Sequence, residues 1–104
     1  MDGLRPSEIH WIINHYIGVS GGYLGDFSYT SHREFYAAYC DLTIDPQDYP
    51  GTTRQRFLAV LSCADPRCQA AIVRGVARRF PPGSEVQRTR EAHAKLLAFA
   101  KRCG

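Results

Sequence analysis

Four helix-start signals divide this 104-residue chain, and they restrict its fold more than any other feature. In three of them a Ser or Thr is followed three residues later by Glu or Gln, so that each side chain can cap the other's backbone amide. These capping boxes are Ser31–Glu34, Thr52–Gln55 and Ser84–Gln87. The fourth signal, Asp65–Pro66, is an N-cap followed by proline at the first helical position. Together they predict helices that begin near residues 32, 53, 66 and 85.

Apolar side chains recur with the period of a helix. Ile9, Ile12, Ile13, Tyr16 and Ile17 form one stripe, which predicts a helix over about 7–17 that ends at Gly18. Similar stripes extend the other four helices over about 32–41, 53–63, 66–79 and 85–102. The predicted inward residues are Phe35, Ala38, Tyr39 and Leu42; Phe57, Leu58 and Leu61; Cys68, Ala71, Ile72, Gly75 and Val76; and Val86, His93, Leu96, Leu97 and Ala100.

No stretch alternates polar and apolar residues between hairpin turns, as half-buried strands do. We therefore predict the all-α class, with residues 1–104 forming one domain, a compact bundle of five to six short helices. The ending at Gly104 has no stop-like feature, which is compatible with a domain excised from a longer protein.

Residues 18–30 contain four glycines but also several aromatic residues. We interpret this segment as an ordered loop whose aromatic side chains, from Tyr23 to Tyr29, cap the core. A phosphate-binding loop requires Lys and Ser/Thr after its last glycine. Here Gly25 is followed by Asp26 and Phe27, which favours a structural role.

Charge and cysteine content narrow the function classes. The net charge of +3 is mildly basic, and 11 of the 13 basic residues are arginines, which are enriched at protein interfaces. No apolar run reaches the roughly 18 residues that span a membrane, and the N-terminus has no secretory signal, so we expect a cytoplasmic protein. We expect free thiols at Cys40, Cys63, Cys68 and Cys103, no metal site and no cofactor.

A basic stripe lies opposite the core face of the predicted helix 66–79. Arg67, Arg74 and Arg78 recur at i, i+7 and i+11, and Arg79 flanks them. The stripe is either a solvated face or a docking surface for an acidic partner. A third hypothesis is that these four arginines bind nucleic acid.

An acidic match for the stripe exists in the same chain, in the loop after residue 41. Asp41, Asp45 and Asp48 could meet the arginines of a second copy in a head-to-tail association. Trp11 lies on the flank of the first helix. It either packs under the aromatic loop or anchors an interface, because tryptophan is enriched in hot spots.

Arg88 and His93 form the one enzymatic candidate. The pair resembles the Arg-x4–6-His pair of the HEPN ribonucleases, and this resemblance implies metal-independent RNA cleavage, with His93 as acid or base and Arg88 stabilising phosphate charge. Thr89 departs from the polar residue, often asparagine, that usually follows the arginine. Residues five apart also lie about 140° apart around a regular helix.

Several stretches together resemble the small helical N-terminal modules of bacterial abortive-infection proteins. They are Tyr16–Tyr29, His32–Leu42, Gly51–Phe57 and Gln69–Gly75. The resemblance implies an adaptor of the death-fold type, similar to caspase-recruitment domains, that associates with itself or recruits an effector in the same chain or operon during anti-phage defence. Death folds have six helices, one more than predicted here. We therefore expect a protein–protein interaction module and not an enzyme, with the ribonuclease as the alternative.

Overall fold

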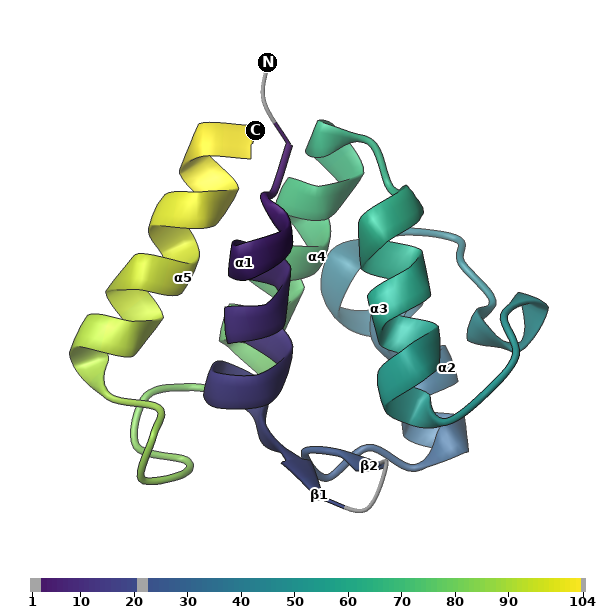
Figure 1. Cartoon of the computed structure of the whole chain (residues 1–104), viewed down its shortest axis with the longest axis horizontal. Helices are drawn as coiled ribbons and strands as arrows, with labels where there is room; N and C mark the ends of the chain where they lie inside the picture. Colours follow the sequence, from purple (N-terminus) through teal and green to yellow (C-terminus); the bar gives the residue numbers. More distant parts are fainter. Residues whose placement is uncertain (1–2, 21–22, 104) are drawn as a thin grey trace.

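The computed structural model describes residues 3–20 and 23–103, most of them helical (Figure 1). Met1, Asp2, Gly21, Gly22 and Gly104, which the sequence-based expectations include, lie outside the described residues. The elements in chain order are α1 (Pro6–His10), η1 (Trp11–Gly18), β1 (Val19–Ser20), β2 (Tyr23–Leu24), α2 (Tyr29–Cys40), η2 (Pro46–Asp48), α3 (Thr53–Cys63), α4 (Pro66–Arg79) and α5 (Arg90–Cys103). The predicted all-α class is confirmed.

The first helix runs from Pro6 to Gly18 without a break, close to the predicted 7–17. Its second part, η1, has π-helical hydrogen bonding. All five residues of the predicted apolar stripe are buried. The helix ends at Gly18, whose φ of 93° is open to glycine at little cost and strained for other residues.

The helices α3 and α4 begin where their caps predict. Thr52 Oγ1 accepts the Gln55 amide at 3.2 Å, and Gln55 Oε1 accepts the Thr52 amide at 2.9 Å. Asp65 Oδ1 accepts the Cys68 amide at 2.8 Å. Each cap satisfies an amide that the first turn of a helix leaves without a partner. The predicted bounds 53–63 and 66–79 are confirmed.

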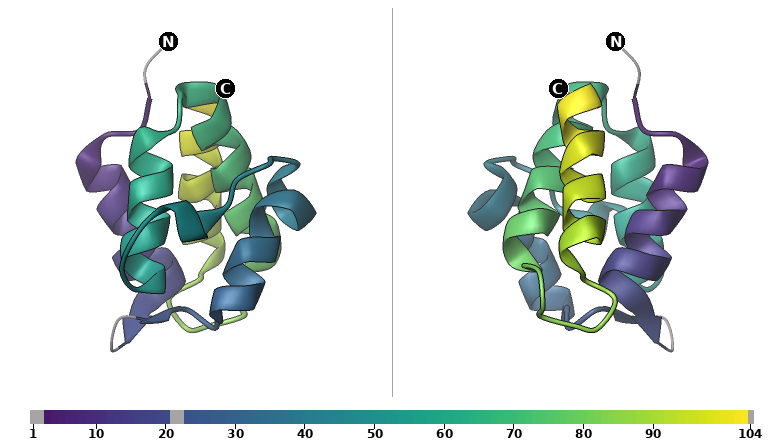
Figure 2. Two further views of the ribbon diagram at one scale, coloured as in Figure 1. Left: turned by 90° about the vertical axis from the view of Figure 1, so that its right-hand side faces the viewer. Right: turned by 90° about the vertical axis from the view of Figure 1, so that its left-hand side faces the viewer.

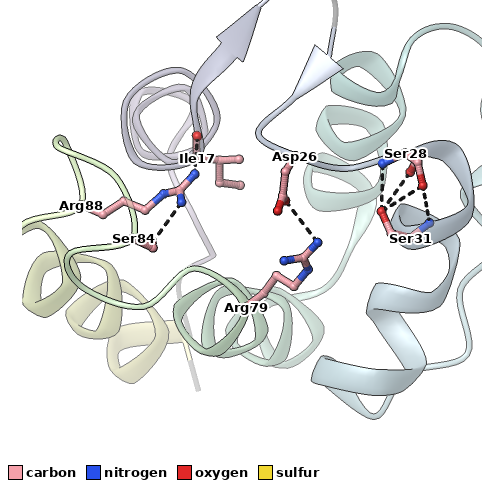
Figure 3. Close-up of polar contacts among 7 residues, drawn as sticks. All are labelled: Ile17, Asp26, Ser28, Ser31, Arg79, Ser84 and Arg88. Atoms are coloured by element: carbon pink, nitrogen blue, oxygen red, sulfur yellow. Dashed lines mark hydrogen bonds and ion pairs between the residues drawn. The ribbon is translucent and has the colours of Figure 1, made fainter.

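The predicted start of α2 is wrong by three residues. Ser28 is the N-cap, and the helix begins at Tyr29. Ser28 Oγ accepts the Ser31 amide at 3.0 Å, while Ser31 Oγ accepts the Ser28 amide at 2.8 Å (Figure 3). Ser31 therefore closes a capping box that begins upstream, and Glu34 stands free on the helix surface.

The aromatic segment before α2 contains a minimal antiparallel hairpin instead of a plain loop. Val19 pairs with Leu24, and Ser20 pairs with Tyr23. Phe27 and Leu24 are buried and cover the core as expected, but Tyr23 and Tyr29 are exposed. The prediction that all the aromatic side chains cap the core is therefore wrong for the two tyrosines.

The predicted start of α5 is wrong by five residues. The Thr89 hydroxyl caps the helix by accepting the Ala92 amide at 3.0 Å, and α5 begins at Arg90. Ser84 lies in a loop, where its hydroxyl donates to the Pro81 carbonyl at 2.6 Å. Val86, predicted to face the core, is 91% exposed. Long-range hydrogen bonds of Arg88 hold this loop against the first helix, so α5 begins only after the loop.

The central helix α4 packs between α2 and α5 (Figures 1 and 2). Gly75 permits the close approach of α2, because a Cβ at that position would collide with the Cys40 Sγ and lie 3.2 Å from the Tyr39 carbonyl oxygen. At the opposite end from the hairpin, Arg102 of α5 forms an ion pair with Glu8 of α1. The two ends of the described chain therefore lie together.

Candidate interaction surface

The arginines of the predicted stripe on α4 divide into two groups. Arg67, Arg74 and Arg78 are exposed, on the side of α4 away from the buried Ile72 and Val76. The Asp65 cap fixes where α4 begins, and this sets the direction in which each arginine projects. Arg78 lies in the last turn, where the helix dipole favours a positive charge.

Arg79 belongs to the fold rather than to the free stripe. Its guanidinium forms an ion pair with Asp26 at 3.1 Å (Figure 3), and its side chain is 22% exposed. The same group lies 5.2 Å from the ring centroids of Phe27 and Phe80, in cation–π contact with both. Arg79 therefore joins α4 to the segment that follows the hairpin.

A surface groove of about 320 Å³ runs between the C-terminal part of α2 and the exposed side of α4. Its lining residues are Ala37, Ala38, Tyr39, Cys40, Asp41, Ala71, Arg74 and Arg78. The groove exists because Gly75 brings the two helices together while the alanines above that contact are too small to fill the space. Tyrosine and arginine are among the residues enriched at the centres of protein interfaces.

Three residues of this groove were missed as surface residues because they complete apolar stripes in the sequence. Ala38 and Tyr39 are exposed, and Ala71 is half-buried, although all three were predicted to face the core. The stripe on α2 is wider than its contact with α4 needs. An apolar stripe wider than one helix contact requires, with alanines at its edge, could have indicated that some of these residues lie on the surface.

Of the three predicted acidic residues, only Asp41 lines the groove. Asp41 lines the groove and ends α2 in the left-handed conformation, with φ of 56°. Asp45 instead caps η2, because its carboxylate accepts the Gln47 amide at 2.9 Å. Asp48 is exposed within η2. Only Asp41 thus joins the arginines, and it lies beside them on the same face.

Trp11 is half-buried against α5 and does not pack under the aromatic loop. Its ring meets Phe99 edge-on at 5.7 Å and stacks on His15 at 5.4 Å. The ammonium group of Lys95 lies 4.5 Å from the centre of the Trp11 ring. The side chain therefore contributes to the contact between the first helix and α5, and its role as an interface anchor stays a prediction.

Arg88 is buried and holds the end of the first helix, rather than lying on a helix with His93. Its Nε donates to the Tyr16 carbonyl at 3.0 Å. Its Nη2 donates to the Ile17 carbonyl at 2.9 Å and its Nη1 to the Ser84 hydroxyl at 3.0 Å (Figure 3). The two carbonyls are among those that a helix end leaves without partners. Arg88 therefore caps the first helix from 71 residues away.

His93 lies within α5, half-buried, with Nε2 3.3 Å from the Ala77 carbonyl oxygen. The structure thus places the two residues of the ribonuclease hypothesis in different elements, one in a loop and one on a helix. All three nitrogens of the Arg88 guanidinium are engaged in the bonds that hold the fold. The ribonuclease stays a prediction, and it would require those bonds to be exchanged for bonds to a phosphate.

The four cysteines are free thiols in different surroundings. Cys40 and Cys103 are buried, Cys68 is half-buried and Cys63 is exposed. Burial raises the pKa of the Cys40 thiol to about 12, so it stays protonated as a packed apolar group. Within residues 3–20 and 23–103, no three His, Cys, Asp or Glu side chains are grouped so as to hold a metal ion.

Two further findings complete the description. None of the helices described here has both the length and the apolar content needed to cross a membrane. Comparison of the chain with known protein families, with curated proteins and with solved structures finds no match in any of the three. The exposed arginines and the groove beside them are therefore the candidate functional site of this domain.

Proposed function

We propose that this domain is a protein–protein interaction module that binds an acidic surface of its partner through Arg74, Arg78 and the α2–α4 groove. The observation that carries the proposal is the position of two exposed guanidinium groups at the edge of a groove lined with alanine and tyrosine. Such a site supplies apolar area for affinity and charge for specificity.

The state of the arginines supports this role. Among the described residues, the ion pairs are Arg79–Asp26 and Arg102–Glu8, so Arg74 and Arg78 hold no carboxylate within ion-pair distance. Arg88 and Arg79, by contrast, are fixed by contacts within the fold. Free guanidinium groups on a rigid helix can bind carboxylates in two-point geometry with little loss of backbone entropy.

The resemblance to abortive-infection modules is consistent with this proposal and gives it a biological setting. There the domain would act as an adaptor in bacterial anti-phage defence, associating with itself or recruiting an effector encoded in the same chain or operon. No catalytic residue is needed for that role. The proposal itself depends on the surface and survives without the resemblance.

A displayed library of helical peptides, varied in the number and position of Glu and Asp, tests the proposal. We expect acidic peptides to be enriched on the natural domain and to lose at least about tenfold in affinity on the Arg74→Glu/Arg78→Glu variant. The matched control is Arg90→Glu/Lys101→Glu, which makes the same charge change at two exposed positions of α5. An equal loss of affinity in both variants would mean that net charge alone determines peptide binding. Equal affinity of the peptides for all three proteins would contradict the proposal.

A further inference from the structure

The α2–α4 groove has two walls of different chemistry, formed by helices that lie side by side (Figures 1 and 2). The α4 wall is one face of that helix, on which residues follow at steps of three and four, and it consists of Ala71, Arg74 and Arg78. The opposite wall is the last turn of α2, which contributes Ala37, Ala38 and Tyr39. One wall is therefore largely basic and the other is apolar.

Arg74 and Arg78 present two positive charges one helical turn apart. Four residues along an α-helix span about 6 Å. Both side chains are exposed, and neither belongs to an ion pair among the described residues. Because one helix positions both arginines, a ligand gains from both at once when its own carboxylates have a similar separation.

The lining of the groove favours a helical ligand over an extended one. The alanine methyl groups along it neither donate nor accept hydrogen bonds, so an extended segment would bury backbone amides and carbonyls without partners. A helix satisfies these groups internally. One turn of a helix is about 5.4 Å long and 10–12 Å across with its side chains. A groove of about 320 Å³ therefore admits the side chains of one helix face and not the whole helix.

Asp41 limits how acidic that helix face can be. It is exposed, and among the described residues that line the groove it supplies the one carboxylate. A ligand that is acidic along its whole face would gain at Arg74 and Arg78 but would be repelled by Asp41. The groove therefore favours a face with two carboxylates and uncharged residues beside them.

None of the helices described in this chain carries such a pair. Each has at most one Asp or Glu between its first and last residue. These acidic residues are Glu8 in α1, Glu34 in α2, Asp48 in η2 and Glu91 in α5. Glu8 is also held by Arg102 of its own chain. A second copy of this domain thus offers the groove no helix with the matching charges.

Resting on the proposed function, we infer that the groove binds an acidic amphipathic helix that this domain does not itself contain. The helix has two carboxylates one turn apart, which pair with Arg74 and Arg78. An apolar side chain beside them packs against the Tyr39 ring and the alanines of the groove. The association is therefore heterotypic: the domain recruits a different partner through this groove and does not pair with itself there.

Fluorescence anisotropy with capped, alanine-based helical peptides tests the inference. One peptide has Glu at i and i+4, and the other has the same composition with Glu at i and i+2, about 200° apart around the helix. We expect the natural domain to bind the first at least about tenfold more tightly, and Arg74→Glu/Arg78→Glu to lose this preference. That variant should instead bind a peptide with Lys at i and i+4, because both charges of each pair are then exchanged.

Controls separate charge and folding from recognition. Arg90→Glu/Lys101→Glu has the same net charge as the groove variant and should keep the natural preference. Circular dichroism checks each protein, and Arg74→Gln/Arg78→Gln replaces the groove variant if its helical content falls. Asp41→Asn keeps a side chain that tolerates the left-handed conformation. It should raise the affinity for a peptide with Glu on three successive turns more than that for the two-glutamate peptide.

Two results would overturn the inference. One is equal affinity of the natural domain for the two glutamate spacings. The other is self-association of the natural domain, measured by sedimentation equilibrium, that Arg74→Glu/Arg78→Glu abolishes. If both glutamate peptides bind equally but still depend on Arg74 and Arg78, the proposed function stands without the helix pattern inferred here. Peptide binding that is independent of the two arginines would remove both.

Discussion

The helix starts of this molecule are built in two different ways. The starts of α3 and α4 are set by neighbouring residues, with caps at Thr52 and Asp65 that satisfy amides three residues away. The segments before α2 and before α5 are instead held to each other and to the first helix. There the Tyr16 hydroxyl donates to the Phe80 carbonyl at 2.6 Å, and Arg88 donates to the Tyr16 and Ile17 carbonyls.

This difference explains where a helix signal succeeds and where it fails. A cap such as Thr52 is worth about 1 kcal/mol and determines a helix start when nothing else acts on the segment. Ser84 has the same signature, but the hydrogen bonds of Arg88 connect its loop to the first helix and together outweigh one cap. Long-range contacts therefore fix the segment before α5, whereas local chemistry fixes the starts of α3 and α4.

Removing the guanidinium of Arg88 should give the largest loss of stability. The loss of structure should begin in the loop before α5 and in the hairpin. Arg88→Met keeps most of the apolar stem but removes the Arg88 donors to the carbonyls of Tyr16 and Ile17, and the Tyr16 carbonyl keeps only the long 3.5 Å contact of Gln87 Nε2. We expect a loss of about 4 kcal/mol in the free energy of unfolding, because each buried carbonyl left unpaired costs about 1–3 kcal/mol. Urea unfolding measures the loss.

Hydrogen exchange locates the effect of that substitution. Amides of residues 81–89 and of the hairpin should lose protection before those of α3 and α4 do. Arg90→Met, at an exposed neighbouring position, should change stability by less than about 0.5 kcal/mol. Equal losses of stability from the two substitutions would show that Arg88 does not hold the loop before α5 against the first helix.

Acid should weaken the packing of α2 on α3 by a smaller amount. His32 is fully buried, with Nε2 2.7 Å from the Tyr36 hydroxyl and its ring between Phe27 and Phe57. Burial, with a contribution from the charge of Arg56, lowers the pKa of His32 to about 4. Among the described residues, His32 Nδ1 has no hydrogen-bond partner that would stabilise a second proton.

The sign of the effect follows from the two pKa values. The unfolded chain binds a proton at His32 near pH 6.5, whereas the folded chain does so only near pH 4. Stability from this group is therefore complete above pH 6.5 and is lost as the pH falls toward 4, by about 3 kcal/mol in total. Between pH 6.5 and 4, the free energy of unfolding of the natural chain should fall more steeply with falling pH than that of His32→Leu. Parallel pH profiles would contradict the assignment.

Much of the fold was predictable from the sequence, for reasons visible in particular residues. The stripe from Ile9 to Ile17 and the caps at Thr52 and Asp65 act within a few residues, so the sequence contains all the information they need. The start of α5 was not predictable, because it depends on Arg88 reaching carbonyls 71 and 72 residues away. An arginine in a predicted helix gives no sign that it will be buried.

The candidate surface was predictable in part for the same reason. Arg67, Arg74 and Arg78 follow directly from the period of α4, and all three are exposed as expected. The groove beside them depends on how closely α2 approaches at Gly75, which is a tertiary contact. Arg79 was grouped with the stripe because its partner, Asp26, lies more than 50 residues away in the chain.

The smallest prediction compares two glutamines with the same sequence signature. Gln55 and Gln87 are both the fourth residue of a capping box in the sequence. In the structure Gln55 Oε1 accepts the Thr52 amide at 2.9 Å, whereas Gln87 Nε2 is 3.5 Å from the Tyr16 carbonyl oxygen. We expect Gln55→Ala to cost about 0.5–1 kcal/mol and Gln87→Ala less than about 0.5 kcal/mol in the free energy of unfolding.

Urea unfolding of the two variants, with Thr52→Ala and Ser84→Ala as a second pair, makes the comparison sharper. Thr52→Ala and Gln55→Ala remove two halves of one capping box, so their effects should combine non-additively. Ser84→Ala should instead couple to Arg88→Met, because the Ser84 hydroxyl accepts a hydrogen bond from Arg88 and shares none with Gln87. Coupling between Ser84 and Gln87 equal to that between Thr52 and Gln55 would mean that local chemistry governs both segments, and the distinction between them would fail.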